Sequence, residues 1–305
     1  MFRRLGLLIA ATAALVYAQQ PLDWSVDASN DDWIQPDAVY NVAHDHQNKL
    51  DVIYPHDATA PVPAVIYIHG GGWVFGTKEG AVLYTLPYLQ MGWAAVNVEY
   101  RMASAANAPA AVEDCRCALR WIVQNAKQYH IDPSRLVVTG HSAGGHLSLM
   151  TGMLTEAAGL DNNCAEDGPE PRVAAIVNWY GITDVADLLS GPNRKTYAVD
   201  WLGSTPDRIA IAKRVSPLSY VRKDLPPILT IHGDKDPVVP YSHAVRLHQA
   251  LDAAGAVNEL VTVPGGGHGM FTDAENRKAF DQVRRFLAAH GLGPVQATGQ
   301  TRIAN

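Results

Sequence analysis

The chain has 305 residues, a formal net charge of −6 and 48% hydrophobic residues. Its 24 basic residues are scattered along the chain, which excludes the basic stripe expected of a nucleic-acid-binding surface. This length and composition fit one large domain, and the acidic excess favours solubility.

Residues 1–18 have the pattern of an export signal. Arg3 and Arg4 precede an apolar run from Leu5 to Val16, and Ala18 is a small residue of the kind that a signal peptidase accepts. The run is shorter than the ~20 apolar residues of a membrane span; an uncleaved N-terminal anchor is the alternative. We therefore expect residues 1–18 to be removed, leaving a periplasmic or extracellular protein with no stable membrane association.

Farther along the chain, short apolar runs alternate with helical patterns. The predicted strands are Leu50–Tyr54, Ala64–Ile68, Ala94–Val98, Leu136–Thr139, Ala174–Trp179, Ile228–Ile231 and Leu260–Val263. The predicted helices are Ala110–Tyr129, Ser142–Leu154, Ser242–Ala254 and Glu275–His290. The later strands are continuously apolar, which is typical of strands covered on both faces. The alternation predicts an α/β fold with a mostly parallel central sheet and helices on both faces. Residues 183–217 have only a weak helical pattern and are expected to cover the site.

The chain has three cysteines. Cys115 and Cys117 lie two residues apart on a predicted helix, so their side chains point in different directions. Cys115 belongs to the apolar set of that helix and is expected to be a buried thiol. We therefore predict a disulfide between Cys117 and Cys164, which export would permit; three free thiols are the alternative. A fourth ligand at a suitable spacing is missing, so no metal site is expected.

The segment Gly140-His141-Ser142-Ala143-Gly144 connects a predicted strand to a predicted helix. In a strand–turn–helix context, Gly-x-Ser-x-Gly indicates a sharp turn that exposes a nucleophilic serine. A serine hydroxyl needs a base and oxyanion donors to react. The alternative is an ordinary turn in which Ser142 is a helix N-cap.

His69-Gly70-Gly71-Gly72-Trp73 directly follows the predicted strand Ala64–Ile68. Glycines allow backbone N–H groups to approach a substrate oxygen closely. The N–H of Gly71 or Gly72, together with that of Ala143, would then form an oxyanion hole. A flexible loop without a catalytic role is the alternative.

Two later loops follow the last two predicted strands and carry the remaining candidates. The first, from His232 to Pro240, contains Asp234 and Asp236, and the second contains His268. Both lie past the carboxyl end of a strand, where open α/β sheets place their sites. His268 would take the proton of the serine, and one aspartate would orient the imidazole. His69 and His232 precede glycines at strand ends and are interpreted as structural.

From about Leu50 to Leu292, the chain resembles the α/β-hydrolase superfamily, in which the triad follows the chain order serine, aspartate, histidine. More narrowly, it resembles the bifunctional carbohydrate esterases (acetyl xylan and feruloyl esterases) and related esterase/lipase proteins. The residues that carry the resemblance are His69–Trp73, Tyr100-Arg101, Asp132–Arg135, Gly140–His146 and His232–Pro240. The resemblance implies a catalytic domain of α/β-hydrolase fold, assigned to residues 19–292 once the signal segment is removed. The polar sequence of residues 293–305 predicts a flexible tail.

The resemblance also implies a secreted serine carboxylesterase with no cofactor. The triad would be Ser142, Asp236 and His268, with Asp234 bonding loop backbone. Acetyl or feruloyl-type esters, as small molecules or on plant polysaccharide, are the expected substrates, and Trp73 and Tyr180 are candidate substrate contacts or core residues. A prolyl-oligopeptidase-like peptidase or amide hydrolase is the main alternative, and a non-catalytic binding domain is a lesser one. The oligomeric state stays open.

Overall fold

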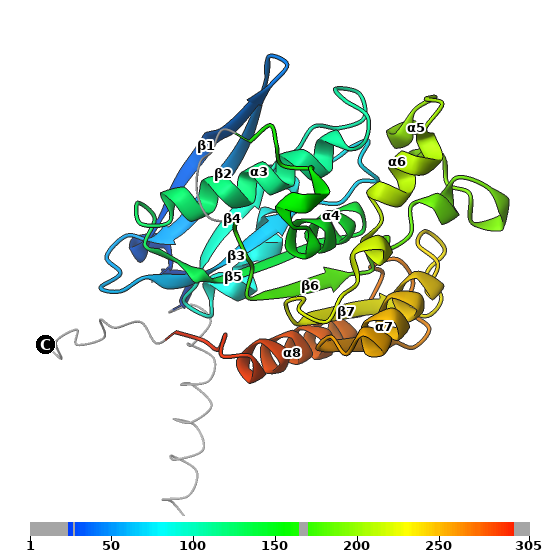
Figure 1. The fold of residues 1–305 in the computed structure, drawn as a ribbon. Coiled ribbons are helices and arrows are strands. Elements are labelled where there is room, and N and C mark those ends of the chain that lie inside the picture. The colour runs from blue at the N-terminus through cyan, green and yellow to red at the C-terminus, as the bar shows by residue number, and fades with distance from the viewer. Residues whose placement is uncertain (1–23, 27, 165–169, 296–305) are drawn as a thin grey trace, which may run out of the picture.

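A computed structural model describes residues 24–26, 28–164 and 170–295 (Figure 1). The predicted signal segment, residues 1–18, and residues 296–305 of the predicted tail lie outside these described residues. Within the described residues, no helix is both long and apolar enough to cross a membrane.

Eight strands of the described chain form one sheet in the order β1-β2-β4-β3-β5-β6-β7-β8. Their bounds are β1 Asp32–Ala43, β2 His46–Pro55, β3 Val62–Ile68, β4 Ala94–Val98, β5 Ile131–His141, β6 Ala175–Trp179, β7 Ile228–Gly233 and β8 Asn258–Val263. The pairs β1–β2 and β2–β4 are antiparallel, and all other pairs are parallel. The predicted mostly parallel sheet is therefore confirmed.

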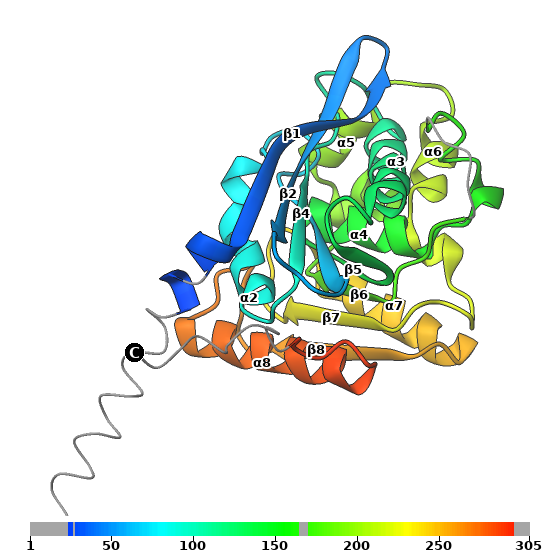
Figure 2. The ribbon, with the colours of Figure 1, turned by 90° about the vertical axis from the view of Figure 1, so that its left-hand side faces the viewer.

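Helices cover both faces of this sheet (Figures 1 and 2). The α-helices are α2 Leu86–Leu89, α3 Ala110–Asn125, α4 Ala143–Met153, α5 Thr196–Leu202, α6 Arg208–Arg214, α7 Ser242–Ala254 and α8 Asp273–Ala289, and the 3-10 turn η1 spans Glu79–Thr85. The core of one face includes residues of α3, α4 and α7, and the core of the other includes residues of α2 and α8. Along β3, Ile66 belongs to the first core and Val65 to the second. Because side chains alternate along a strand, a strand covered on both faces is apolar throughout.

The structure also contains elements that the sequence did not predict. Strand β1 is an edge strand whose residues are mostly exposed, so it lacks the buried apolar pattern of the central strands. Its pairing with β2 supplies the hydrogen bonds that make it a strand. Helices α5 and α6 lie in residues 183–217, where each is only 7 residues long and too short for a clear periodicity. Helix α3 ends at Asn125 rather than at Tyr129.

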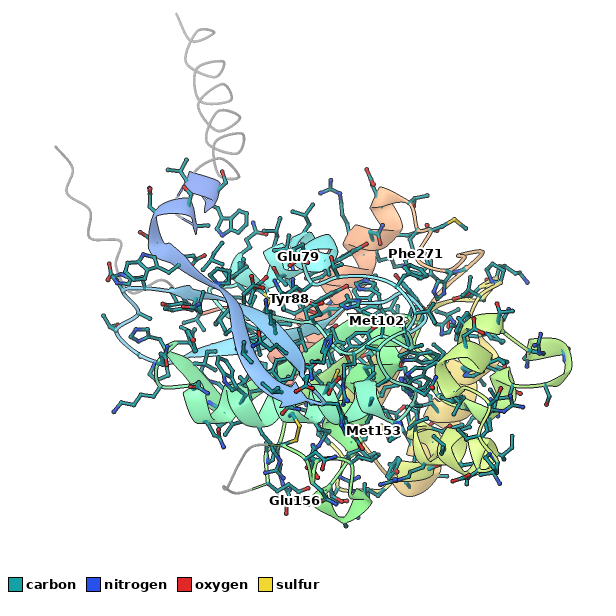
Figure 3. All side chains as sticks on the ribbon, turned by 90° about the horizontal axis from the view of Figure 1, so that it is seen from above. Glu79, Tyr88, Met102, Met153, Glu156 and Phe271 are labelled. Atoms are coloured by element: carbon teal, nitrogen blue, oxygen red, sulfur yellow. A yellow bond between two sulfur atoms is a disulfide. The ribbon has the colours of Figure 1, made fainter. Side chains whose placement is uncertain are left out.

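A disulfide joins Cys117 of α3 to Cys164, with the two Cα atoms 4.9 Å apart (Figure 3, near the labelled Glu156). This is the pairing predicted from the sequence, and Cys115 is a buried free thiol. Ion pairs from Arg116 and Arg120 of the same helix to Asp161 lie beside it, at 2.8 and 3.1 Å. The segment after α4 is therefore attached to α3 by covalent and ionic contacts.

Candidate active site

Ser142 lies between β5 and α4 in a backbone conformation with φ 57° and ψ −119°. This region is sparsely populated by residues other than glycine, and it persists only where the surrounding structure enforces it. A Cβ atom on Gly140 or Gly144 would overlap the carbonyl oxygen of Ile68, so only glycine allows β5 and α4 to pack against the end of β3. The hydroxyl of Ser142 makes no helix-capping hydrogen bond. The turn therefore presents the serine to neighbouring loops rather than to its own helix.

The hydroxyl of Ser142 meets the imidazole of His268, which the loop after β8 supplies. The distance from Ser142 Oγ to His268 Nε2 is 2.9 Å, and that from His268 Nδ1 to Asp236 Oδ2 is 2.7 Å. A carboxylate can only accept, so Nδ1 carries the proton and Nε2 is left free to accept from the serine. The structure thus brings the three predicted residues together in a hydrogen-bonded line that can remove a proton from Ser142.

The carboxylate of Asp236 is fully buried, and both of its oxygens are occupied. Its Oδ1 accepts the backbone N–H groups of Val238 and Val239 at 2.8 and 2.9 Å, while Oδ2 faces His268 and, at 3.3 Å, Nε2 of His232. Burial alone would raise the pKa of Asp236. Hydrogen bonds from the two histidines outweigh burial and hold this pKa well below its usual range. Asp236 is therefore a fixed anion behind His268.

Asp234 takes the other role expected of it. Its Oδ1 accepts the backbone N–H of Gly265 at 2.7 Å, which ties the loop after β7 to the loop after β8. The structure therefore places Asp236, and not Asp234, on His268.

The glycine loop after β3 lies directly beside the serine. A Cβ atom on Gly70 would come within 2.7 Å of the His141 carbonyl oxygen and 3.6 Å of the Ser142 Cβ. Gly71 and Gly72 have φ values of 114° and 59°, which favour glycine. Their N–H groups and that of Ala143, the first residue of α4, donate to no other described residue. These three backbone donors are therefore without an acceptor among the described residues, and their use as an oxyanion hole stays a prediction.

The candidate substrate contact at Trp73 is wrong. Its side chain is 0% exposed, stacks on Trp201 of α5 at a ring distance of 4.1 Å, and donates from Nε1 to His146 Nδ1 at 3.2 Å. A large ring gains most from burial when its N–H also finds an acceptor. Trp73 is therefore core beneath the glycine loop, held on His146, which in turn donates from Nε2 to the Val215 carbonyl at 2.7 Å.

Tyr180 lies beside the proposed base. Its ring centre is 4.7 Å from that of His268 in an edge-on arrangement, and its side chain is largely buried. Burial, reinforced by the charge of Asp236, raises its pKa, so the phenol stays neutral. Tyr180 contacts the ring of His268, and its role as a substrate contact stays a prediction.

Three exposed apolar side chains border the site, and the sequence analysis did not single them out. They are Phe75 (69% exposed), Tyr84 (53%) and Met270 (77%), called here the apolar rim. Phe75 lies against Gly71, Met270 against Gly267 beside the base, and the ring of Tyr84 is 4.5 Å from that of His141. Each is a single apolar residue in a loop or 3-10 turn, so no periodicity marked it.

His141, the residue before the nucleophile, is held by aromatic neighbours. Its Nδ1 is hydrogen-bonded to the Tyr67 hydroxyl, and its ring stacks on Trp179. Burial lowers its pKa to about 3, so it is neutral near pH 7. Among the described residues, no group of three or more histidine, cysteine or acidic side chains could hold a metal ion.

Comparisons with known proteins place the chain among esterases of this fold. The family model BD-FAE matches residues 50–251, and a second model, described as TAP-like protein, matches residues 207–298. Esterase LipC of Mycobacterium tuberculosis is 32% identical over 225 residues, and the match covers 69% of this chain and 54% of LipC. Lipase 2 of a Moraxella species is 28% identical over 66% of this chain and 51% of its own length. The chain thus spans about half the length of the curated relatives it matches.

Solved structures give a similar result over nearly their whole length. A truncated carbohydrate esterase from gut microbiota has a TM-score of 0.70 and 30% identity, and the match covers 85% of this chain and 96% of that one. A propionate-bound esterase 2 of Thermogutta terrifontis has a TM-score of 0.72 and 25% identity, with coverage of 86% and 96%.

Proposed function

The chain belongs to the BD-FAE family of α/β-hydrolases, whose model matches about two thirds of it, and from this premise we propose that the protein is a serine carboxylesterase. The observation that carries the proposal is the hydrogen-bonded line from Ser142 Oγ through His268 to Asp236, at 2.9 and 2.7 Å. The related proteins named as esterases support the same reaction class.

In the proposed reaction, His268 takes the hydroxyl proton of Ser142 as Oγ attacks the ester carbonyl carbon. The carbonyl oxygen becomes negatively charged and accepts from the N–H groups of Gly71 or Gly72 and of Ala143. His268 then protonates the leaving alcohol, and the acyl group stays on the serine. Water enters, loses a proton to His268 and attacks the acyl carbon, which releases the acid and restores the hydroxyl.

For the substrate, we propose acetyl and feruloyl-type esters, carried on small molecules or on plant polysaccharide. The likeness to a carbohydrate esterase supports the sugar-linked ester. The apolar rim supports an acyl group with an aromatic ring, because Tyr84 beside His141 and Phe75 beside Gly71 offer exposed flat apolar surface next to the nucleophile turn and the glycine loop.

We further propose that the mature protein is exported to the periplasm or the medium. The disulfide between Cys117 and Cys164 supports this compartment, since such bonds persist mainly in oxidising surroundings. Thiol titration of denatured protein purified from its native compartment should find one free thiol before reduction and three after it; three before reduction would contradict the disulfide.

The decisive experiment compares the full chain with its Ser142→Ala variant on p-nitrophenyl acetate, acetyl xylan and methyl ferulate. We expect hydrolysis that is lost in the variant. An anilide with the same acyl group should be a much poorer substrate, and a preference for the anilide would favour the amide-hydrolase alternative. Equal activity of the two proteins, or none on any ester, would refute the proposal.

The substrate proposal has its own test. Tyr84→Ser should raise KM for methyl ferulate more than for p-nitrophenyl acetate, because the ring of the ferulate is on the acyl group, whereas the acyl group of p-nitrophenyl acetate is a small acetyl and its ring is on the leaving alcohol. Val257→Ser is the control, since Val257 is equally exposed (53%) and is not part of the rim. Equal KM changes for the two substrates would remove the rim from substrate binding.

A further inference from the structure

His232, interpreted from the sequence as structural, contacts the carboxylate of the triad. It is the second-last residue of β7, just before the loop that carries Asp236, and it is 0% exposed. Its Nε2 is 3.0 Å from the Val239 carbonyl oxygen and 3.3 Å from Asp236 Oδ2. A carbonyl oxygen can only accept, so Nε2 must carry a hydrogen. The same N–H lies near the carboxylate, to which it makes the longer of its two contacts.

Asp236 Oδ2 therefore faces two imidazole N–H groups, one from His268 and one from His232. We propose that His232 is a positioning residue for the triad: its Nε2–H holds Asp236 Oδ2 in line with His268 and limits how strongly the carboxylate attracts the His268 Nδ1 proton. This inference rests on the proposed serine esterase mechanism and deepens it.

The other nitrogen of His232 supports a role at Nε2. In the described part of the chain, Nδ1 is buried and has no hydrogen-bond partner. A buried polar atom without a partner costs about 1–3 kcal/mol. An apolar side chain would fill the same space without that loss, so the favourable contacts of this histidine are those of Nε2 with Val239 and Asp236.

The surroundings of Asp236 leave few other groups for this task. No arginine or lysine of the described residues forms an ion pair with it. The titratable groups that face it are His268, His232 and the phenols of Tyr180 and Tyr197. Burial raises the pKa values of both phenols, and the negative charge of Asp236 raises them further. Tyr241 packs edge-on against the far side of His232, at a ring distance of 5.6 Å. The two histidines are therefore the only side chains in these contacts that donate to the carboxylate.

Removing the His232 donor should shift the pH dependence of activity in a defined direction. Asp236 Oδ2 would keep one side-chain donor, so its negative charge would act more strongly on His268, which would take up a proton more readily. His268 would then cease to act as a base at a higher pH, and the acid limb of the kcat/KM profile would move to higher pH. The carboxylate would also be less well oriented, which should lower kcat and leave KM nearly unchanged.

The experiment compares His232→Leu with His232→Gln on p-nitrophenyl acetate across the pH range. Leucine removes the donor, whereas the terminal amide of glutamine restores an N–H close to the position of Nε2. We expect kcat to fall about tenfold in His232→Leu, the size of one hydrogen bond to a charged group. His232→Gln should recover most of this loss and return the acid limb toward that of the parent protein.

His248→Leu is the matched control. His248 of α7 is also buried (5% exposed) with an unpartnered Nε2, and its Nδ1 contacts Asn258 rather than the triad. Its loss should lower thermal stability without moving the acid limb. If His232→Leu does not fold, His232→Gln is compared with His232→Asn, whose shorter amide cannot reach Asp236 and should behave as the donor-free variant.

The inference is overturned if the donor-retaining and donor-free variants lose equal activity, or if the acid limb stays where it is in the parent protein. These results differ from a failure of the proposed function, which would appear as a parent protein with no Ser142-dependent ester hydrolysis at all.

Discussion

The two halves of the site are held in different ways. The nucleophile half, at the ends of β3 and β5, is fixed by the close approach of backbone atoms: Gly140 and Gly144 lie so near the Ile68 carbonyl that no side chain fits. The acid–base half, at the ends of β7 and β8, is fixed by side-chain contacts: Asp236 accepts from two backbone N–H groups and from His268, and His232 Nε2 lies 3.3 Å from its Oδ2.

This difference predicts different sensitivities. A change in volume should disrupt the nucleophile half even when no polar group is altered, because close-packed backbone cannot move aside. A change of one polar atom at constant volume should disrupt the acid–base half, because a buried carboxylate depends on its donors. The following predictions test that contrast, from the largest expected effect to the smallest.

The largest effect should come from the residues at which the halves meet. Ser142→Ala and His268→Ala should each lower kcat by on the order of 10³-fold or more, and the double variant should be little worse than either, because the two act as one unit. Steady-state kinetics on p-nitrophenyl acetate measure this. Effects that multiply in the double variant would contradict a shared proton transfer.

The acid–base half should be sensitive to an isosteric change. Asp236→Asn should lower kcat by on the order of 10³-fold, since an amide cannot hold the required imidazole tautomer. Asp234→Asn is the matched control and should lose far less, because Asp234 contacts only loop backbone. The opposite ranking of the two variants would assign the triad carboxylate to Asp234.

The nucleophile half should be sensitive to a single methyl group. Gly144→Ala would place a Cβ within 2.6 Å of the His69 carbonyl oxygen as well as against Ile68, and should lower the free energy of unfolding by about 1–3 kcal/mol along with activity. Gly80→Ala is the control, because the nearest atom to its new Cβ is Thr77 Oγ1 at 3.7 Å. Denaturant unfolding that leaves Gly144→Ala as stable as Gly80→Ala would contradict the close fit.

Acid should affect the two halves in sequence. Burial lowers the pKa of His146, beneath the glycine loop, to about 4, whereas an unfolded histidine titrates near ~6.5. The unfolded state therefore binds more protons as the pH falls from ~6.5 to ~4, and stability is lost across that window. The folded pKa of Asp236 is lowered instead, so this group stabilises the fold above about pH 3.9, and its contribution is lost only in stronger acid.

Urea unfolding should accordingly show at least about 2 kcal/mol less stability at pH 4.5 than at pH 7 from His146 alone. Burial also lowers the pKa values of His141 and His243, so the total loss should be larger. His146→Asn should therefore remove only its own share of the pH dependence. A free energy of unfolding that stays constant between these pH values would show that His146 is not kept neutral by the fold.

Much of the nucleophile half could be predicted from the sequence. The turn at Ser142 needs glycine at Gly140 and Gly144, because a Cβ there would meet the Ile68 carbonyl oxygen, and Gly71 and Gly72 have positive φ values that favour glycine. The local residue types therefore reveal both features. The central strands were likewise visible because burial on both faces demands continuous apolar runs. Edge strand β1 was missed because most of its side chains are exposed and its pairing partner decides its conformation.

The sequence by itself thus predicted the fold class, the nucleophile turn and the order of the triad, since each rests on local residue patterns. It favoured the pairing of Cys117 with Cys164 but left three free thiols open, and the structure decided between them. Only the tertiary structure decided that Asp236 rather than Asp234 faces the base, that Trp73 is core and that His232 shares the triad carboxylate. The reason is that these depend on where a side chain points between distant segments: Ser142 and His268 are 126 residues apart, and no local pattern records that contact.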